Sequence, residues 1–354
     1  MSNKTNITGS DYQEQDDEEV LSQPPAADED KGFAWNLRPR SLSEYIGQHD
    51  VVERLRIGVS AARTRGDALD HILLHGPPGL GKTTLAHIIA TEMGTNITHT
   101  SGPALERPAD IVGILSNLDE GNVLFIDEIH RLNHSIEEYL YSAMEDYKVD
   151  FVAGKGAFAK TIPFPLKHFT LIGATTRAGL LSAPLRDRFG ITCHLDFYGD
   201  DELMMVVKRS STLLKVTIDD DSAKEIARRS RGTPRIANRL LRRVRDYAQV
   251  KGDWNIDLDL AKHALAQEGV DDGGLDRLDR LYLTTILQNY DGGPVGVEAL
   301  AATLNEDSSI LVDVVEPFLL KKGFVIRTSS GRKATDLARE HLGLPPVGGQ
   351  GRLL

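Results

Sequence analysis

The sequence predicts an α/β fold in which helices cover both faces of a parallel sheet, followed by two smaller and mainly helical domains. Short apolar runs alternate with helical patterns over residues 70–200, as in folds built on a parallel sheet. A glycine-rich loop follows the first of these runs, and from about residue 200 the pattern is helical. Near the C-terminus, helices are followed by two short strand-like runs.

Length and composition are those of a globular protein of several domains. The 354 residues are 40% hydrophobic, which is enough for two or three packed domains. No apolar run is long enough to span a membrane, and the N-terminus lacks the apolar core of a secretory signal. Cys193 is the only cysteine, which excludes an internal disulfide and is typical of a reducing compartment. We therefore expect a soluble, cytoplasmic protein.

The negative charge of the chain is concentrated at its N-terminus. The net charge is -11, and residues 1–30 carry nine acidic side chains against one lysine. This segment is poor in aliphatic residues, so it cannot bury enough surface to offset the entropy of ordering it. We predict a disordered acidic tail over residues 1–32 and a flexible tail over residues 343–354. The remainder is nearly neutral, which is compatible with binding to nucleic acid.

Three apolar runs of strand length define the first domain, which we place at residues 33–198. They are HILLHG (71–76), NVLFID (122–127) and FTLIGAT (169–175). Strands that are apolar on both faces are typical of the centre of a parallel sheet. We therefore expect these runs to pair with one another beneath two layers of helices.

Helical patterns dominate the two domains that follow. In a helical domain at residues 199–270, the periodic segments are residues 200–214, 222–230, 235–250 and 258–269. The linker DDGG at residues 271–274 introduces a third domain, which we place at residues 271–342. Its pattern predicts helices at residues 275–290, 295–304 and 308–322, and then a two-stranded ribbon at residues 324–335. This order is typical of a winged helix, a variant of the helix-turn-helix.

The segment GPPGLGKT (76–83) fits the phosphate-binding loop, or P-loop, between a strand and a helix. Glycines such as Gly79 and Gly81 let backbone N–H groups surround phosphate oxygens, and the helix N-terminus favours negative charge. Lys82 reaches the β- and γ-phosphates of a nucleotide, and the Thr83 hydroxyl binds Mg²⁺. An ordinary glycine-proline turn is the alternative, but such a turn does not require this order of strand, loop and helix.

A second nucleotide motif follows the apolar run VLFI. Asp127 and Glu128 come at the end of this predicted strand, and ligands of parallel sheets bind at the carboxyl ends of the strands. We expect Asp127 to hold Mg²⁺ and Glu128 to activate the water that attacks the γ-phosphate. A solvated surface pair is the alternative, and the upstream P-loop argues against it. The sequence thus predicts an ATPase that uses ATP and Mg²⁺.

Hydroxyl and guanidinium groups further along the chain could complete this site. GATT (173–176) ends the third strand on two hydroxyls, one of which either contacts the γ-phosphate or water or simply caps a helix. The segment PLRDRFG offers Arg186 and Arg188 as positive charge for the transferred phosphoryl group. In GTPR, Arg235 lies at the start of a helix capped by Thr233, which directs its guanidinium towards an anion.

The order of these motifs resembles that of AAA+ ATPases, and more narrowly that of the RuvB family, the bacterial motors that migrate Holliday junctions. The resemblance covers residues 37–342. It rests on LRPRSLSEYIGQ, HGPPGLGKTTLA, LFIDEIHRL, MEDY, GATTRAGLLSAPLRDRFG, GTPRIANRLLRRVRDYA and GLDRLDRLYL. The fold that it implies is a large P-loop AAA+ domain, a helical lid domain and a winged-helix head domain.

The resemblance also implies roles for residues of the nucleotide site. It implies an adenine pocket of Leu37, Arg38, Tyr45 and Ile46, and phosphate contacts from Gly79, Gly81, Lys82, Thr83 and Thr84. Asp127 and Glu128 are its Walker B pair. Further nucleotide contacts are Thr176 as sensor 1, Arg235 as sensor 2, Tyr198 at the lid hinge, and Glu145, Asp146 and Tyr147 at the subunit boundary. Arg188 is the arginine finger that enters a neighbour's site, with Arg186 as the second candidate.

The activity that the resemblance implies is ATP-driven translocation of duplex DNA, which moves Holliday junctions during recombination and DNA repair. A finger supplied by a neighbour requires an oligomer, and the family implies a ring of six copies. Its implied partners are a RuvA-like junction-binding protein and a junction-resolving nuclease. The family also connects this activity to the SOS response to DNA damage.

Residues 148–169 predict a β-hairpin, because apolar and polar residues alternate around the turn AGKG. At this place in the family, an apolar hairpin docks on the RuvA-like partner. The segment after the turn, AFAKTIPFPLKHF, has fewer basic residues than is usual in the family. The alternative is a hairpin that buries its apolar side chains against its own domain.

The winged helix is the expected DNA-binding domain. Its expected recognition helix, SSILVDVVEPFLL, is apolar and includes Asp313 and Glu316, so it is poorly suited to reading a major groove. Arg327 and Arg332 flank the turn of the ribbon, and we expect them to contact the DNA backbone. Contacts to phosphate alone predict binding to double-stranded DNA and four-way junctions without sequence specificity. The alternatives are an ordinary solvated ribbon here and a DNA surface on the arginine-rich helix at residues 228–245.

Two other AAA+ functions have different signatures. A clamp loader typically carries a Ser-Arg-Cys finger motif with a zinc module or a collar domain, whereas this chain has LRDRFG and one cysteine. A DNA-binding initiator of the origin-recognition type also joins AAA+ to a winged helix, but it needs a sequence-reading helix, unlike SSILVDVVEPFLL. Both remain alternatives to a branch-migration motor at this point.

Overall fold

The computed structural model describes residues 36–153, 160–251 and 253–345. The chain divides into two compact units, Met1–Arg38 and Pro39–Leu354, and all the helices and strands named below belong to the second unit. The predicted acidic tail at residues 1–32 lies outside the described residues, as do residues 346–354 of the predicted C-terminal tail.

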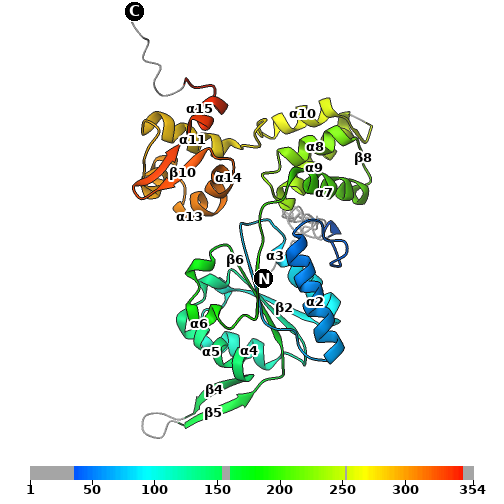
Figure 1. Cartoon of the computed structure of the whole chain (residues 1–354), viewed down its shortest axis with the longest axis vertical. Helices are drawn as coiled ribbons and strands as arrows, with labels where there is room; N and C mark the ends of the chain where they lie inside the picture. The colour runs from blue at the N-terminus through cyan, green and yellow to red at the C-terminus, as the bar shows by residue number, and fades with distance from the viewer. Residues whose placement is uncertain (1–35, 154–159, 252, 346–354) are drawn as a thin grey trace, which may run out of the picture. The chain divides into compact units, whose positions relative to one another are not determined.

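Five parallel strands form the sheet of the large domain (Figure 1). They are β1 (Ile72–His75), β2 (Ile97–Ser101), β3 (Val123–Asp127), β6 (Thr170–Thr175) and β7 (Ile191–His194). Their order is β2-β3-β6-β1-β7, and every adjacent pair is parallel. The buried strands β1, β3 and β6 confirm the three predicted strands and the predicted fold class. The edge strands β2 (ITHTS) and β7 (ITCH) lack an apolar run, because edge positions leave side chains in contact with solvent.

Helices cover both faces of this sheet (Figure 1). The main ones are α2 (His49–Arg65) and α3 (Lys82–Met93) on one face, and α4 (Pro108–Ser116) and α5 (His134–Asp146) on the other. Shorter connecting elements are η1 (Gly102–Ala104), η2 (Ile129–Arg131), η4 (Ala178–Leu180) and α6 (Ala183–Arg186). Helices α2 and α3 end at Gly66 and Gly94, whose left-handed backbones let their N–H groups bond the last-turn carbonyls. The core between sheet and helices joins Leu124 of β3 to Ile111 and Leu140.

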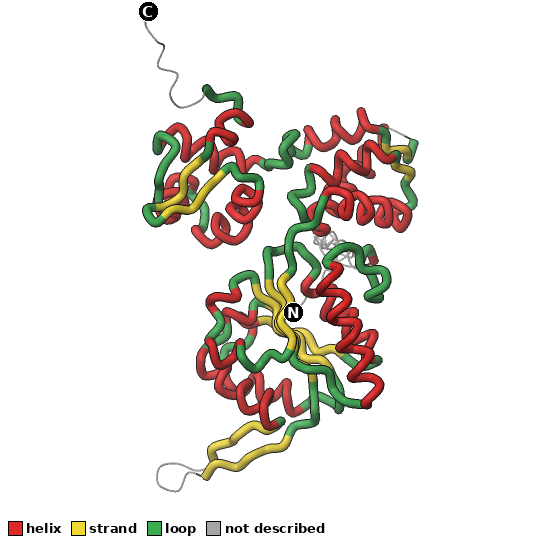
Figure 2. Tube along the Cα trace, viewed as in Figure 1, coloured by secondary structure: helices red, strands yellow, loops and turns green. Residues whose placement is uncertain are grey.

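A two-stranded hairpin leaves the large domain after α5. Its strands are β4 (Lys148–Ala153) and β5 (Lys160–Pro165), which pair antiparallel with Val149 opposite Phe164. The two strands project beyond the helices of the domain (Figure 2). The structure therefore confirms the predicted hairpin, while residues 154–159 of its turn lie outside the described residues.

The lid domain is helical, as predicted. Its helices are α7 (Asp200–Leu214), α8 (Asp220–Arg228), α9 (Pro234–Lys251) and α10 (Leu258–Gln267). A short parallel pair, β8 (Thr217–Ile218) and β9 (Asn255–Ile256), was not predicted, because two residues carry no periodic signal. Asp219 and Asp257 start α8 and α10 by accepting hydrogen bonds from Ser222 N and Leu260 N at 2.7 and 2.8 Å.

The head domain has the predicted order of helices and ribbon. Its elements are α11 (Arg277–Asn289), α12 (Val297–Leu304), α13 (Ser308–Ile310), the π-helical η5 (Leu311–Val315), α14 (Glu316–Lys321), β10 (Val325–Thr328), β11 (Gly331–Ala334) and α15 (Asp336–His341). The single helix predicted at residues 308–322 is interrupted by η5. Pro317 explains this, because it donates no N–H and its ring clashes with the carbonyl of Asp313. Among the helices of the described residues, none is long and apolar enough to cross a membrane.

We predict that Gly173 in β6 cannot be replaced without loss of stability. A Cβ there would lie 2.9 Å from Ile129 Cδ1 and 3.1 Å from Phe189 Cζ, so Gly173→Ala overpacks a buried site and costs about 1–3 kcal/mol. The matched control is Gly113→Ala, because Gly113 lies in α4 and its added Cβ would meet nothing within 4 Å. That control should gain about 0.5–1 kcal/mol from helix propensity. Denaturant midpoints that are equal for the two variants would contradict this packing.

Candidate functional site

The P-loop turns at the carboxyl end of β1 through positions that only glycine can occupy. Gly76 has φ +143°, and a Cβ there would lie 2.2 Å from the carbonyl oxygen of Leu195. Gly81 has φ +101°, and its Cβ would lie 2.4 Å from the hydroxyl of Tyr45. Because left-handed backbone excludes most side chains, these glycines are required by both conformation and close contact. The loop therefore has the tight curvature that a cradle of backbone N–H groups needs.

Lys82 is buried at the start of α3 and is held over this loop. Its Nζ donates hydrogen bonds to the carbonyl oxygens of Gly76 and Pro77, at 2.7 and 2.8 Å. Burial lowers the pKa of Lys82 to about 8, an effect that the nearby Asp127 carboxylate opposes and the Arg235 charge reinforces. Phosphate oxygens would be stronger acceptors than these two carbonyls. The predicted phosphate lysine is therefore in place, with its charge weakened until an anion binds.

The donors beside Lys82 fit a hard divalent cation. Thr83 offers a hydroxyl in the first turn of α3, and Asp127 ends β3 on the same edge of the sheet. No cluster of three or more His, Cys, Asp or Glu side chains suited to a metal occurs within the described residues. One carboxylate and one hydroxyl, completed by phosphate oxygens and water, suit Mg²⁺ better than a cage made entirely of protein groups.

Glu128 stands next to this site in a left-handed backbone conformation, with φ +48°. Its backbone N–H donates to Asp127 Oδ1 at 2.9 Å, and its carboxylate accepts from Arg131 Nη1 at 2.9 Å. Glu128 is 49% exposed in this ion pair, and exposed pairs contribute at most about 1 kcal/mol. The pair is therefore weak enough to release the carboxylate towards a water molecule.

The two hydroxyls that end β6 have different surroundings. Thr175 is buried, and its Oγ1 lies 2.9 Å from His130 Nδ1 and accepts a hydrogen bond from Arg177 N at 2.9 Å. Thr176, the predicted sensor, is the partly buried residue that follows the end of the strand. Sequence reasoning missed His130, whose only signal is its position just after Asp127 and Glu128. This histidine joins the acidic motif of β3 to the hydroxyl at the end of β6.

The lid domain packs directly on the P-loop. The Arg235 N–H lies 3.4 Å from the carbonyl oxygen of Gly79, and a Cβ on Gly79 would meet the Cβ atoms of Arg235 and Thr233 at 3.2 and 3.5 Å. Gly232, three residues earlier, accepts a hydrogen bond from Tyr198 N at 2.9 Å. The structure therefore brings the predicted sensor 2 residue and the predicted hinge residue to the loop.

Two tyrosines fix the middle of the loop. Tyr45 Oη donates to the carbonyl oxygen of Leu80 at 3.0 Å, and Tyr198 Oη donates to Tyr45 Oη at 3.0 Å. Burial raises the pKa of Tyr45 to about 12 and raises that of Tyr198 as well, so both remain donors.

The other predicted nucleotide contacts lie nearby in the sequence. Ile46 adjoins Tyr45, and Thr84 lies in the first turn of α3. Leu37 and Arg38 belong to the first compact unit, so their place in the adenine pocket stays a prediction.

Arg188 lies at the opposite edge of the sheet from the P-loop. It precedes the first residue of β7, Ile191, which pairs with the first residue of β1, whereas the P-loop follows the last residue of β1. The four residues of β1 alone span about 13 Å at roughly 3.3 Å each. Arg188 Nη2 pairs with Glu145 at 2.7 Å, and its guanidinium lies 4.7 Å from the centroid of the Tyr141 ring. Arg188 is therefore directed away from the phosphate site of its own chain.

The segment Glu145–Tyr147, predicted to meet nucleotide at a subunit boundary, lies at this same amino edge. Asp146 pairs with Lys148 at 3.0 Å. The Tyr147 ring packs on His168 and Phe169, at centroid distances of 4.3 and 5.9 Å, just before β6 begins. Like Arg188, these residues are separated from the P-loop of their own chain by the length of the strands. Arg186, the second finger candidate, is exposed.

The ribbon arginines of the head domain share one buried carboxylate. Arg327 Nε and Arg332 Nε donate to the two oxygens of Glu316 at 2.7 and 2.9 Å, and Tyr282 Oη donates to the same group at 3.0 Å. Glu316 is completely buried, whereas Arg327 is 47% and Arg332 is 18% exposed. Arg327 thus presents more of its side chain to solvent than Arg332 does. The other acid of the expected recognition helix, Asp313, pairs with Arg177 at 2.6 Å.

Two further surfaces were predicted from the sequence. In the hairpin, Ile162 and Phe164 of β5 are 53% and 42% exposed, so this strand is not buried against its own domain. On α9, the rival DNA surface, Arg243 and Arg245 pair with Asp246 at 3.3 and 2.7 Å, which reduces the free positive charge of that helix.

Each of the three domains matches a family model of its own. The matching family models are the Holliday junction DNA helicase RuvB P-loop domain at residues 37–195, the RuvB AAA lid domain at residues 198–271 and the RuvB C-terminal winged helix domain at residues 272–343. The three matches follow one another along the chain and cover residues 37–343 except 196–197.

Whole-chain comparisons give the same result. The Holliday junction branch migration complex subunit RuvB of Desulfosudis oleivorans is 58% identical over 310 residues, which are 88% of this chain and 90% of that protein. The subunit of the same name from Clostridium kluyveri is 58% identical over 307 residues, 87% of this chain and 88% of that protein. Among solved structures, the RuvB Holliday junction branch migration motor of Thermotoga maritima aligns with a TM-score of 0.81 and 51% identity, covering 88% of this chain and 99% of that one.

The environment of Lys82 predicts proton uptake when nucleotide binds. Its pKa of about 8 in the free protein should rise when phosphate oxygens replace the loop carbonyls, since an anion favours the charged ammonium. Near pH 7 the lysine is mostly charged in both states and uptake is small, whereas above pH 8 uptake should approach one proton. Titration calorimetry with ADP and Mg²⁺ in buffers of different ionisation enthalpy measures this number. Lys82→Arg is the control, because arginine stays protonated, and equal uptake by both proteins would contradict the prediction.

Proposed function

The chain belongs to the RuvB family of Holliday junction branch-migration ATPases, and from this premise we propose that six copies form a ring that drives duplex DNA through a four-way junction. The observation that carries the proposal is the separation of Arg188 from the P-loop of its own chain by the length of β1. Each phosphate site then lacks an arginine finger until a neighbour supplies it, which makes assembly a condition of hydrolysis. The family assignment leaves no support for the clamp-loader and initiator alternatives.

At the phosphate site, each residue has one task. Lys82 and the backbone N–H groups of the P-loop bind the phosphates, and Glu128 accepts a proton from the attacking water. Thr176 orients that water or the γ-phosphate, as sensor 1. Thr83 and Asp127 would hold Mg²⁺, which supplies positive charge to the phosphate oxygens when it is bound.

Residues from outside the P-loop add further contacts to the nucleotide. Arg235 places a guanidinium from the lid domain towards the γ-phosphate, so the lid senses whether that phosphate is present. Arg188 enters the site of the adjacent copy and stabilises the charge that develops during phosphoryl transfer. Glu145, Asp146 and Tyr147 lie on the same edge as Arg188 and would contact nucleotide across the same subunit boundary.

The head domain binds the phosphate backbone of DNA. Arg327 is the principal phosphate contact, because it is the more exposed of the two ribbon arginines. Arg332 supports it and completes the charge of the ribbon. Both acids of the neighbouring helix are occupied by ion pairs, so they neither read bases nor repel phosphates with free charge. Contacts to phosphates do not depend on the base sequence of the DNA, and they weaken as the salt concentration rises.

Partners complete the proposed machine. A RuvA-like junction-binding protein docks on the hairpin at residues 148–169, where Ile162 and Phe164 offer an apolar surface. A junction-resolving nuclease then acts on the migrated junction.

The single cysteine, Cys193, is free and buried, which supports a reducing, cytoplasmic location.

The proposed function is tested by dissociation of a synthetic four-way junction with long homologous arms, with and without a RuvA-like protein. Wild-type protein should dissociate the junction only with ATP and Mg²⁺, and faster with the partner. Glu128→Gln should bind ATP normally but lower both hydrolysis and dissociation by at least about 100-fold, because the base is lost while the cation ligands survive. ATP hydrolysis by wild type without any junction dissociation would contradict the motor.

We predict that the exposed face of β5 determines the response to the partner. Ile162→Asp places a charge in the docking surface and should weaken partner affinity by about tenfold or more, as expected for an apolar anchor. ATP hydrolysis in the absence of partner should stay at the wild-type level. Val250→Asp is the matched control, since Val250 is 80% exposed on α9 of the lid domain. Equal partner affinity of the two variants, measured by calorimetry, would remove β5 from the docking surface.

A further inference from the structure

The short segment Arg231–Arg235, which runs from the connection after α8 into the first turn of α9, is held by three parts of the chain. At its C-terminal end, Arg235 N lies 3.4 Å from the carbonyl oxygen of Gly79 in the P-loop. In its middle, Gly232 O accepts a hydrogen bond from Tyr198 N at 2.9 Å, where the lid domain begins. A displacement of the P-loop or of the lid therefore acts on this segment directly.

At its N-terminal end, Arg231 is inserted into the head domain. Its Nη1 lies 2.8 Å from Asp276 Oδ2 and 3.0 Å from Asp279 Oδ2, and its Nη2 donates to Val314 O at 2.9 Å. The guanidinium also lies 5.0 Å from the centroid of the Phe318 ring. All four of these partners belong to the head domain, and the side chain of Arg231 is only 7% exposed.

Placing Arg231 here costs free energy that a contact between apolar side chains of the two domains would avoid. Arg231 has a left-handed backbone with φ +54°, which is unfavourable for a residue with a side chain. It also removes a charge from solvent, and buried ion pairs are weak evidence of stability because apolar residues can replace them. What arginine adds is a fixed direction, because its planar group donates to several acceptors at once.

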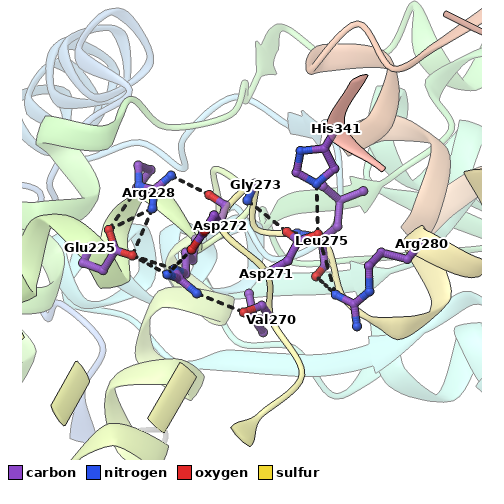
Figure 3. Close-up of polar contacts among 10 residues, drawn as sticks. Glu225, Arg228, Val270, Asp271, Asp272, Gly273, Leu275, Arg280 and His341 are labelled. Atoms are coloured by element: carbon purple, nitrogen blue, oxygen red, sulfur yellow. Dashed lines mark hydrogen bonds and ion pairs between the residues drawn. The ribbon is translucent and has the colours of Figure 1, made fainter. Parts of the chain in front are cut away.

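Ion pairs and hydrogen bonds hold the linker to both the lid and the head domain (Figure 3). On the lid side, Arg229 donates to Val270 O at 3.0 Å and pairs with Asp272 of the linker. On the head side, Asp271 lies 2.9 Å from His341 and accepts from Gly273 N at 2.9 Å. The linker predicted at residues 271–274 is thus held by ion pairs and hydrogen bonds rather than left as a free hinge.

A second sensing segment reaches the same part of the head domain. Arg177, which directly follows the predicted sensor 1 residue Thr176, pairs with Asp313 at 2.6 Å. Asp313 and Val314 both lie in η5, and Glu316, which binds the ribbon arginines, comes immediately after it. Both segments that flank the γ-phosphate position therefore contact η5, next to the carboxylate that positions the DNA-binding ribbon.

We propose that Arg231 is a positioning residue that couples the nucleotide state of the P-loop to the DNA-binding head domain, by transmitting movements of the segment Arg231–Arg235 to η5 and Glu316. This inference rests on the proposed motor function. Loss of the γ-phosphate moves Arg235 and the segment attached to it, Arg231 carries the movement to Asp276, Asp279 and Val314, and the ribbon arginines follow Glu316. Arg231 contacts neither nucleotide nor DNA, so it contributes to coupling and not to the chemical step.

The first experiment measures the ATP consumed per junction dissociated by full-length rings with the partner. Arg231→Lys keeps the charge but loses the multiple donors, and it should raise this ratio about fivefold or more, the lower range of ordinary coupling free energies. Asp276→Asn removes one partner while keeping a residue that caps α11, and it should give a smaller rise. Arg228→Gln is the matched control, because Arg228 bonds Glu225 and Asp272 but nothing in α11 or η5. Its ratio should stay at the wild-type value, as should the ATPase rate of all three variants without DNA.

The second experiment measures hydrogen exchange of the full chain without DNA, with and without a non-hydrolysable ATP analogue. Nucleotide should change the exchange of residues 311–318 in wild type and in Arg228→Gln, but not in Arg231→Lys. A wild-type ATP ratio together with a wild-type exchange response in Arg231→Lys would overturn the proposal. If that variant does not fold, unchanged exchange of residues 311–318 in wild type on nucleotide binding would overturn it instead. Failure of wild type to dissociate junctions rejects the motor function, whereas the exchange response still decides the coupling.

Discussion

The direction of the strands is the constraint on which the rest of the structure depends. Because all five strands run parallel, the P-loop after β1 and the acidic pair after β3 meet at one edge of the sheet, and Arg188 before β7 lies at the other. No side-chain rotation brings an arginine across the length of a strand. On the proposed function, one chain therefore holds halves of two different active sites and completes neither alone. The proposed ring assembly follows from that separation.

The nucleotide site could largely be predicted from the sequence, because its parts are local. A strand, a glycine-rich turn and a helix start occupy adjacent residues, so the position of Lys82 follows from eight letters of sequence. Central strands such as β3 are apolar on both faces, so a short local run of residues is enough to predict them. The same locality explains the accurate bounds of α7, whose period is uninterrupted from Asp200 to Leu214. The fold class was accordingly correct, and Asp127 lies at the end of β3 as predicted.

Contacts between distant segments could not be predicted, because residue type alone does not name a partner. The hydrogen bond between His130 and Thr175 joins residues 45 positions apart, and the ion pair of Arg177 with Asp313 spans 136. Glu316 was interpreted as an unsuitable acid in a recognition helix, whereas burial makes it the anchor of the ribbon arginines. The edge strands β2 and β7 were missed because solvent permits polar residues there. In each case tertiary packing, not local propensity, decides the role.

The most direct test of an active site shared between chains is a mixing experiment with two inactive variants. Lys82→Ala lacks the phosphate lysine but keeps its finger, and Arg188→Ala keeps its P-loop but lacks the finger. If neighbours complete each site, mixing equal amounts should restore ATP hydrolysis at about a quarter of the interfaces, the share in which an intact loop meets an intact finger at random. The activity should vanish again when either variant is in large excess. No recovery at any ratio, with mixed rings demonstrated by native mass spectrometry, would contradict a finger supplied by the neighbour.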